Sequence, residues 1–198
     1  MHNAIGTYRD NISRVKALGG LNQALGSIVT VAIDLSDILR AQHVLAVSAL
    51  DYFVHEAART GMLEIFDGKR APTPAYSRFR ISLDSLGSGA VVSRSNLENE
   101  IRTQHSFLSF QHPDRIADAL RLIVEFKLWD TVAATLGTDP QVLKDTLKLV
   151  VDRRNKIAHE ADIDPTYPKA RWPISAADVD GTINFLNETV EAIHDVIL

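Results

Sequence analysis

The longest helical pattern in the sequence runs from about Ala32 to Arg59, and Gly61 is expected to end it. Its apolar side chains cover much of the helix circumference and not a single stripe; they are Ile33, Ile38, Leu45, Leu50, Phe53 and Val54. A helix that is apolar nearly all round needs neighbours on most sides to keep these side chains from water. We therefore expect a central helix with other helices packed around it.

Helical spacing of apolar residues recurs along the rest of the chain. The expected helices cover residues 5–18, stopped by Gly19-Gly20; 96–110; 114–125, capped by Asp114; 129–136, ended by Gly137; 139–159; and 176–197, capped by Ser175. Glycine favours the end of a helix and proline its first turn, which is how these boundaries are drawn. No segment combines alternating polarity with β-branched residues well enough to predict a strand. The expected fold is all-α, a bundle of antiparallel helices with additional short helices.

Composition sets the broad class of protein. The chain has 198 residues, 45% hydrophobic and 23% charged, which suits one globular domain over residues 1–198. It has no cysteine, which fits a reducing cytoplasm, and no apolar run near the roughly 18 residues of a membrane span. The net charge of −4 argues against indiscriminate binding to nucleic acid, although residues 69–102 hold six basic and three acidic residues.

The amphipathic helix at residues 142–159 carries the side chains that point to chemistry. A buried stripe is expected from positions at steps of four and three: Leu143, Leu147 and Val150. Arg154 is next on that stripe, and because a guanidinium is costly to bury alone, it needs a carboxylate, a wet cleft or a phosphate. His159 follows five residues later, and histidine exchanges protons near neutral pH. An arginine for phosphate and a histidine for protons are a minimal set for RNA cleavage.

This motif and three stretches around it resemble one known family. Arg154-Asn155-x-x-x-His159 is similar to the Arg-x(4–6)-His motif of HEPN domains, with Asn155 at the usually polar position after the arginine. Residues 47–56, 109–116 and 159–165 look more specifically like the RiboL-PSP branch of that superfamily. The similarity runs from about Ile33 to the C-terminus.

The resemblance implies a HEPN-type bundle that forms a two-fold dimer, with a ribonuclease site at the dimer interface that uses no metal or other cofactor. It implies attack by the RNA's own 2′-hydroxyl, leaving a 2′,3′-cyclic phosphate and a 5′-hydroxyl. His159 would act as general base or acid, Arg154 would bind the scissile phosphate, and Asn155 would orient His159 or donate to phosphate. The residues expected to support the site or contact RNA are Arg153, Lys156, Glu160 and Asp51.

The implied partners are an RNA substrate, a second copy of the chain, and an antitoxin or other regulatory partner in phage defence or a toxin–antitoxin system. Some toxins of this superfamily carry a tyrosine two positions after the motif histidine, where an antitoxin modifies it. Here that position is Ala161, which argues against this mode of control. An intact motif is also compatible with a second hypothesis, a non-catalytic HEPN dimer that binds RNA or a protein.

Helical geometry limits how Arg154 and His159 act together. At about 100° per residue, Asn155 and His159 share a face, whereas Arg154 lies roughly 140° from His159. The length of arginine or a loosened helix end near Ala158 would bring the two together. Alternatively, two copies of the motif converge across a two-fold interface. In a purely structural interpretation, Arg154 pairs with an acidic residue such as Asp51 while His159 merely ends the helix.

Two further features leave a binding and a structural interpretation open. Asp51 and His55 are four residues apart and so neighbours on one helix face, either as a surface pair or as part of a site. Residues 67–89 are irregular and include Gly87-Ser88-Gly89. Its basic and aromatic side chains would hold single-stranded RNA, or its aromatic rings would instead pack on the bundle. These residues are Lys69, Arg70, Tyr76, Arg78, Phe79 and Arg80.

Other chemistries lack their residues. The seven histidines show no His-x-x-x-His or His-Glu-x-x-His spacing, so no metal site is predicted. Without cysteine, thiolate ligands and nucleophiles are excluded. No Gly-x-x-x-x-Gly-Lys-Ser/Thr sequence is present to hold nucleotide phosphates.

Overall fold

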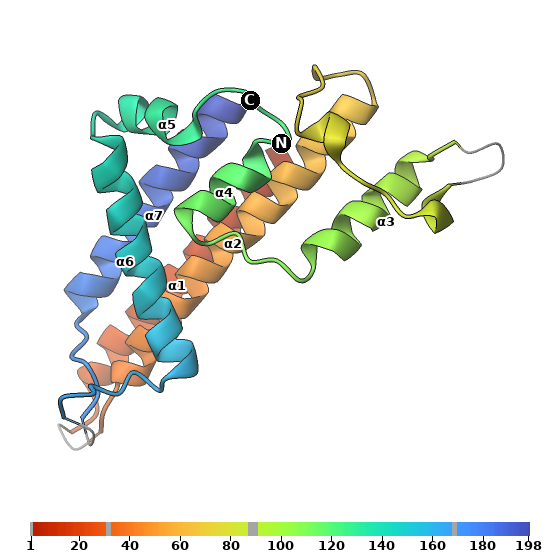
Figure 1. Ribbon diagram of the computed structural model, residues 1–198. Coiled ribbons are helices and arrows are strands. Elements are labelled where there is room, and N and C mark those ends of the chain that lie inside the picture. The colour runs from red at the N-terminus through yellow and green to blue at the C-terminus, as the bar shows by residue number, and fades with distance from the viewer. Residues whose placement is uncertain (1, 31–32, 87–90, 168–169) are drawn as a thin grey trace.

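The computed structural model describes residues 2–30, 33–86, 91–167 and 170–198, and these residues form helices, turns and two isolated β-bridges (Figure 1). The α-helices are α1 (His2–Gly26), α2 (Ser36–Phe66), α3 (Arg94–His105), α4 (Pro113–Leu120), α5 (Leu128–Leu136), α6 (Pro140–His159) and α7 (Ala176–Ile197). The predicted all-α fold is confirmed. Within the described ranges, no helix has both the length and the apolar character needed to cross a bilayer.

The central position of α2 is also confirmed, because α2 packs against α1, α3, α4, α6 and α7. Helices α1 and α2 run antiparallel, as shown by the ring contact of Tyr8 with Phe53 and the hydrogen bond from Gln42 to the Val15 carbonyl. Figure 1 shows α6 and α7 along one part of α2, whereas α3 projects from the bundle near the other end of α2. The two ends of α2 therefore carry different neighbours.

One face of α2 is less buried than its sequence predicts. Leu50, Phe53 and Val54 are fully buried, as expected, but Leu45 is 46% exposed. Ile33 lies before α2 and is also exposed, and the expected start at Ala32 falls outside the described residues. The exposed face continues through Ser48 and Tyr52. This open strip of α2 is the surface on which the sites described below lie.

Two predicted glycine stops are wrong, because α1 continues through Gly19 and Gly20, and α2 continues through Gly61. A Cβ atom on Gly61 would lie 2.6 Å from Ile123 Cγ2, and one on Gly19 would lie 2.7 Å from Gln42 Nε2. Glycine lowers helix propensity by about 1 kcal/mol. At Gly19 and Gly61 its small size instead allows close packing, which keeps the helix intact.

Gly61→Ala should destabilise the protein, because the added methyl would overlap a β-branched side chain that is itself 2% exposed. Overpacking of this kind costs about 1–3 kcal/mol, which exceeds the gain of about 1 kcal/mol from helix propensity. Gly181→Ala in α7 is the matched control, because nothing lies within 4 Å of its added Cβ. Urea unfolding should show lower stability for the first variant and equal or higher stability for the second. Stabilisation by both would contradict the packing role of Gly61.

The predicted boundaries around the motif helix are confirmed. Gly137 ends α5 in the left-handed conformation, with φ 65°. The Asp139 carboxylate accepts hydrogen bonds from the backbone of the first turn of α6, in which Pro140 lies. Ser175 caps α7 in a reciprocal arrangement with Asp178. Local side-chain chemistry therefore sets where α6 and α7 begin.

The helices before α5 differ from the prediction. Helix α3 ends at His105, before the expected limit at residue 110. Helix α4 is capped by the His112 side chain, which accepts a hydrogen bond from the Asp114 backbone N–H at 3.4 Å, so the predicted cap by Asp114 is wrong. Helix α4 also ends at Leu120, five residues before the expected end at 125. Residues 106–112 instead form an extended connection that contacts α2.

The described part of the loop after α2 supports the structural interpretation for Arg70, Tyr76 and Phe79, whereas Arg78 and Arg80 are exposed. Tyr76 and Phe79 are partly buried against the core. Arg70 donates to Glu64 Oε2 at 3.2 Å and to the Ile197 carbonyl at 2.8 Å, so it ties the loop to the end of α7. The Gly87-Ser88-Gly89 sequence lies outside the described residues.

Candidate active site at the end of the motif helix

Helix α6 is positioned by its buried stripe. Leu147 is fully buried and Leu143 is 3% exposed, and the α2 residue His43 donates from Nε2 to the Val150 carbonyl at 2.9 Å. Burial lowers the pKa of His43, although the hydrogen bond to the Val150 carbonyl acts in the opposite direction. The helix stays regular to His159, so a loosened end near Ala158 is not observed. Packing thus holds the motif on a rigid element.

Arg154 is half-buried and has no carboxylate partner among the described residues. Its Nη1 donates to Asn155 Oδ1 at 3.1 Å, and its Nε is buried without a hydrogen-bond partner in the described part of the chain. The alternative pairing with Asp51 is not observed, because Asp51 accepts from the Phe110 backbone N–H at 2.6 Å and from Gln111 Nε2 at 3.1 Å. The guanidinium of Arg154 therefore retains donors for another group.

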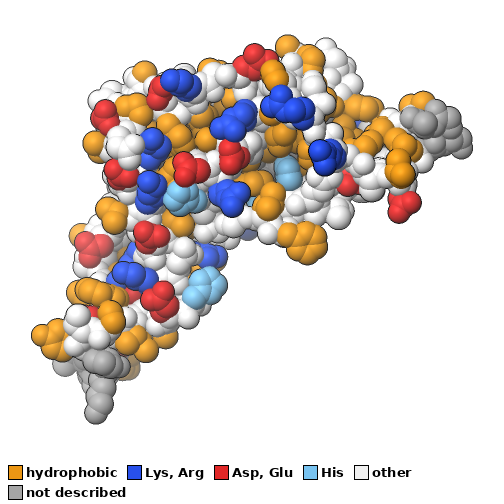
Figure 2. Space-filling view, viewed as in Figure 1, with side chains coloured by type: hydrophobic (Ala, Val, Ile, Leu, Met, Phe, Trp, Pro, Cys, Tyr) orange, Lys and Arg blue, Asp and Glu red, His pale blue; other side chains and the backbone are white. Residues whose placement is uncertain are grey.

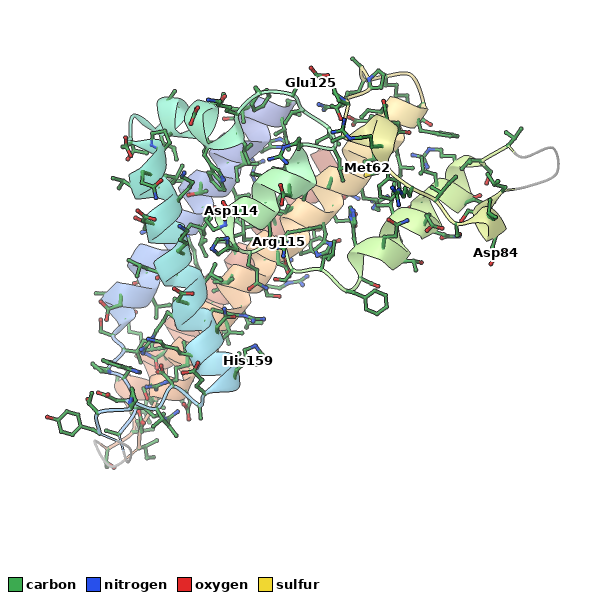
Figure 3. All side chains as sticks on the ribbon, in the orientation of Figure 1. Met62, Asp84, Asp114, Arg115, Glu125 and His159 are labelled. Atoms are coloured by element: carbon green, nitrogen blue, oxygen red, sulfur yellow. The ribbon has the colours of Figure 1, made fainter. Side chains whose placement is uncertain are left out.

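His159 is exposed at the C-terminal end of α6. Figure 3 shows its side chain projecting outward from the end of that helix. Because α6 is regular, Asn155 lies one turn before His159 on the same face, whereas Arg154 is directed to another part of the circumference. No hydrogen bond joins Arg154 to His159 in the described structure. A single chain thus presents both groups but does not bring them together.

The chain reverses sharply after α6. Ala161 and Asp162 have φ values of 52° and 59°, in the left-handed region that non-glycine residues seldom adopt. The Glu160 and Asp162 backbone N–H groups both donate to the Lys156 carbonyl at 3.0 Å. This turn satisfies a carbonyl of the last helical turn and directs the Asp162 side chain into the protein.

A buried carboxylate holds this turn in place. The Asp162 side chain is 0% exposed, and its Oδ2 accepts from Arg40 Nε at 2.7 Å and from Arg153 Nη2 at 2.8 Å. We call Arg40, Arg153 and Asp162 the Asp162 clasp. Since Arg40 belongs to α2 and Arg153 to α6, the clasp fixes the end of the motif helix against the central helix.

The loop before α7 joins the same structure. The Trp172 backbone N–H donates to the Asp162 carbonyl, and the Trp172 carbonyl accepts from Arg40 Nη2, both at 2.9 Å. The Lys156 Nζ lies 5.4 Å from the centre of the Trp172 ring, within reach of a cation–π interaction. The end of α6 is therefore held from two directions, by α2 and by the segment that leads into α7.

The structure separates the predicted site residues into three groups. Arg154, Asn155 and His159 lie together on the last turns of α6, with Glu160 exposed as the C-terminal cap. The Arg153 side chain is hydrogen-bonded to Asp162, and the Lys156 side chain lies over the Trp172 ring. Asp51 lies on α2 and contacts the connection between α3 and α4 instead of the motif.

Sequence reasoning missed the partners of the clasp. Asp162 belongs to the 159–165 stretch that carried the family resemblance, but nothing in its spacing shows that it is buried. Arg40 was read as part of the central helix, although it is 6% exposed and would need a partner there. An arginine on a central helix indicates that a carboxylate partner is needed. The sequence does not show which carboxylate it is.

The surface around the motif carries both signs of charge. Figure 2 shows Lys and Arg side chains interspersed with Asp and Glu over the face on which α6 and α4 lie. In the described ranges, no three His, Cys, Asp or Glu side chains are grouped closely enough to hold a metal ion. The local features of the motif, and not a broad basic surface, therefore distinguish this region.

An all-α bundle that presents Arg-x4-His at the end of a packed helix has the features of the HEPN class. The chain matches the family model RiboL-PSP-HEPN over residues 9–198, and it belongs to that family. The match begins earlier than the resemblance at Ile33 indicated and includes most of α1. No curated protein and no solved structure matches the chain.

The contacts of Asp51 explain why two distant stretches carry the family signal together. Asp51 lies in the 47–56 stretch and accepts hydrogen bonds from Phe110 and Gln111 in the 109–116 stretch. Such a bond between a carboxylate and a backbone N–H is charge-assisted and sets the path of the connection before α4. Asp51 thus joins two of the stretches in which the resemblance to the family was noted.

Proposed function

We propose that the protein is a metal-independent endoribonuclease whose active site is completed by a second copy of the chain. The observation that carries this proposal is the state of Arg154. Arg153, its neighbour in sequence, and Arg40 of α2 are both paired with Asp162, whereas Arg154 has no carboxylate partner among the described residues. A half-buried guanidinium with an unused donor, close to an exposed histidine, suits a phosphate ligand.

The geometry of α6 supports a dimer. Because the helix is regular, Arg154 and His159 of one chain point in different directions, and a two-fold axis near the motif would bring groups from two copies together. A shallow groove of about 490 Å³ lies beside the motif, lined by Val44 and Leu45 of α2 and by Ile157 of α6. These apolar side chains are better covered by a partner than left in water.

The proposed reaction uses the substrate as its own nucleophile. His159 of one copy takes the proton from the RNA 2′-hydroxyl, and the 2′-oxygen attacks the adjacent phosphorus. The bond from phosphorus to the 5′-oxygen breaks, and the leaving oxygen takes a proton from His159 of the other copy. Arg154 balances the negative charge that develops on the phosphate oxygens. The products are a 2′,3′-cyclic phosphate and a 5′-hydroxyl.

Asn155 has a positioning role in this proposal. Its Oδ1 accepts from Arg154, and it lies one helical turn before His159, so it links the two groups. The biological setting is proposed to be phage defence or a toxin–antitoxin system, with an antitoxin or another regulatory partner. That setting rests on family membership and not on the geometry of the site.

Purified protein should cleave single-stranded RNA in the presence of EDTA, because the nucleophile, the proton carriers and the phosphate donor come from the RNA and the chain. The 3′ ends should carry cyclic phosphate, and RNA with 2′-O-methyl groups should remain intact. Gel electrophoresis and mass spectrometry of the products measure both. Loss of cleavage on chelation would exclude the proposed mechanism. Binding of RNA without cleavage of any substrate would favour the alternative, a non-catalytic dimer.

A further inference from the structure

A second concave site lies between α2 and α3, away from the motif. It is a cleft of about 490 Å³, and its walls include Tyr52, His55 and Arg59 of α2 with Arg102 and His105 of α3. We call it the α2–α3 cleft. None of these residues takes part in the reaction proposed above. The cleft is large enough for a nucleotide, which places it within the usual range of ligand sites.

The arginines of the α2–α3 cleft are already neutralised. Arg59 pairs with Glu56 at 2.5 Å and with Glu98 at 2.7 Å. Arg102 lies 3.3 Å from Glu98 and 3.6 Å from Glu56, so two arginines share two glutamates. A site for a bare phosphate would keep a guanidinium free, as Arg154 does. The charge balance of the cleft therefore favours a neutral polar ligand.

Flat rings form part of the walls and are held in place. The His55 ring lies against Phe110 with centroids 4.4 Å apart and an interplanar angle of 40°. The His105 ring meets Phe110 edge-on at 5.2 Å. His55 Nε2 is 3.7 Å from Asp51 Oδ1, and Asp51 is itself fixed by the Phe110 backbone. The rings are thus positioned before any ligand binds.

Tyr52 supplies an accessible aromatic surface at the cleft. It is 43% exposed, which is unusual for a large ring on a central helix. The His105 ring on the neighbouring wall is uncharged, since burial lowers its pKa to about 4 and leaves it neutral near pH 7. Ser48 and Ser106 add hydroxyl groups that donate and accept. An exposed ring with polar edges and no net charge matches the chemistry of a nucleobase.

The cleft lies on the same open strip of α2 as the groove beside the motif. Leu45 lines the groove beside Ile157 of α6, and Ser48 and Tyr52 continue the strip toward α3. Leu45 and Tyr52 are seven positions apart, which is about 10 Å of helix rise. A short single strand of RNA can span this distance, from the groove beside the motif to the α2–α3 cleft.

We propose that the α2–α3 cleft binds a nucleobase of the single-stranded RNA substrate, with the base on the Tyr52 ring and its polar edge toward His55. This inference rests on the proposed function, which it deepens by adding a base-binding subsite to the phosphate site. The cleft, whose arginines are paired with glutamates, would bind the base, whereas Arg154, which has no carboxylate partner among the described residues, would bind the phosphate. RNA would thus be held at two points, by Arg154 on α6 and by the cleft between α2 and α3.

The test measures binding and needs no cleavage. Isothermal titration of the protein with the four nucleoside 5′-monophosphates should show binding of at least one, and ribose 5-phosphate, which lacks the base, should bind more weakly. Tyr52→Ala should weaken that binding roughly 5- to 100-fold, the range seen when a ring that stacks on a base is removed. Tyr167→Ala is the matched control, because Tyr167 is 70% exposed and lies outside the cleft. Circular dichroism checks that both variants are folded.

The same variants then separate the two proposals with an RNA oligonucleotide that carries 2′-O-methyl groups. Weaker binding of this RNA by Tyr52→Ala, with unchanged binding by Tyr167→Ala, supports a base of RNA as the ligand. Nucleotide binding that Tyr52→Ala leaves intact overturns the cleft assignment, even if the wild-type protein cleaves RNA. If Tyr52→Ala lost nucleotide binding but bound RNA as well as the wild type, the ligand of the cleft would be a free nucleotide. That result would overturn the assignment to RNA. If the wild-type protein bound a base but cleaved no RNA, the proposed ribonuclease activity would be overturned and the proposed base-binding cleft would be supported.

Discussion

His159→Ala should reduce RNA cleavage by about 10²- to 10⁴-fold, which is the usual contribution of a general acid–base group. Folding should change little, because His159 is exposed at the last position of α6 and its side chain holds no neighbouring element. RNA affinity should also stay near the wild-type value, since Arg154 supplies the phosphate contact. Single-turnover cleavage, thermal melting and RNA binding measured on one preparation check the three expectations.

Two comparison variants sharpen this experiment. His112→Asn changes another accessible histidine but keeps a side chain that caps α4, so cleavage should persist. Arg154→Lys keeps the charge and loses the planar guanidinium, so cleavage should fall with little change in melting temperature. A fully active His159→Ala protein would exclude His159 from catalysis. A strong loss of melting temperature in Arg154→Lys would instead assign Arg154 a structural role.

Asp162→Ala should lower the free energy of unfolding by about 3–5 kcal/mol, because it leaves two arginines of a buried ion pair without their carboxylate. Asp162 is 0% exposed and Arg40 is 6% exposed, so water screens this interaction weakly. The variant should also free the end of α6 from α2 and from Trp172, because Asp162 contacts both. Urea unfolding measures the stability, and amide hydrogen exchange at residues 156–162 measures the local opening.

Asp152→Ala is the matched control, because Asp152 is exposed on the same helix. Its replacement should change stability by no more than about 0.5 kcal/mol. If the two variants unfolded at the same urea concentration, the clasp would contribute no net stability. Such a result would mean that the cost of burying the charges, including the unpaired Asp162 Oδ1, equals the attraction between them.

The fold was predictable where local chemistry sets the outcome. The end of α5 was predicted from Gly137, the start of α6 from Asp139-Pro140 and the start of α7 from Ser175. These predictions succeeded because a terminal glycine or a capping side chain acts within one helical turn. Glycine misled the prediction at Gly19 and Gly61, where a neighbouring side chain occupies the space that a Cβ would take. Contacts of that kind depend on tertiary packing, and sequence spacing does not contain them.

The position of the candidate residues on α6 was predictable from the sequence, but the contacts that hold the end of α6 were not. The periodicity of α6 placed Arg154 after the buried stripe and showed that one regular helix separates it from His159. The turn that follows was hidden, because Ala161 and Asp162 adopt a left-handed conformation without a glycine to indicate it. The bond from Arg40 to Asp162 spans 122 positions of sequence, so no local pattern reveals it.

The Asp162 clasp also has a consequence for the order in which the protein becomes complete during synthesis. Helix α6 leaves the ribosome before Trp172 and Pro173, yet the carbonyls of these two residues accept hydrogen bonds from Arg40 and Arg153. Contacts between residues far apart in sequence form only after both partners are available. A nascent chain that ends within α6 therefore carries the motif without its anchoring loop. The motif reaches its final geometry only after Trp172 and Pro173 have been synthesised.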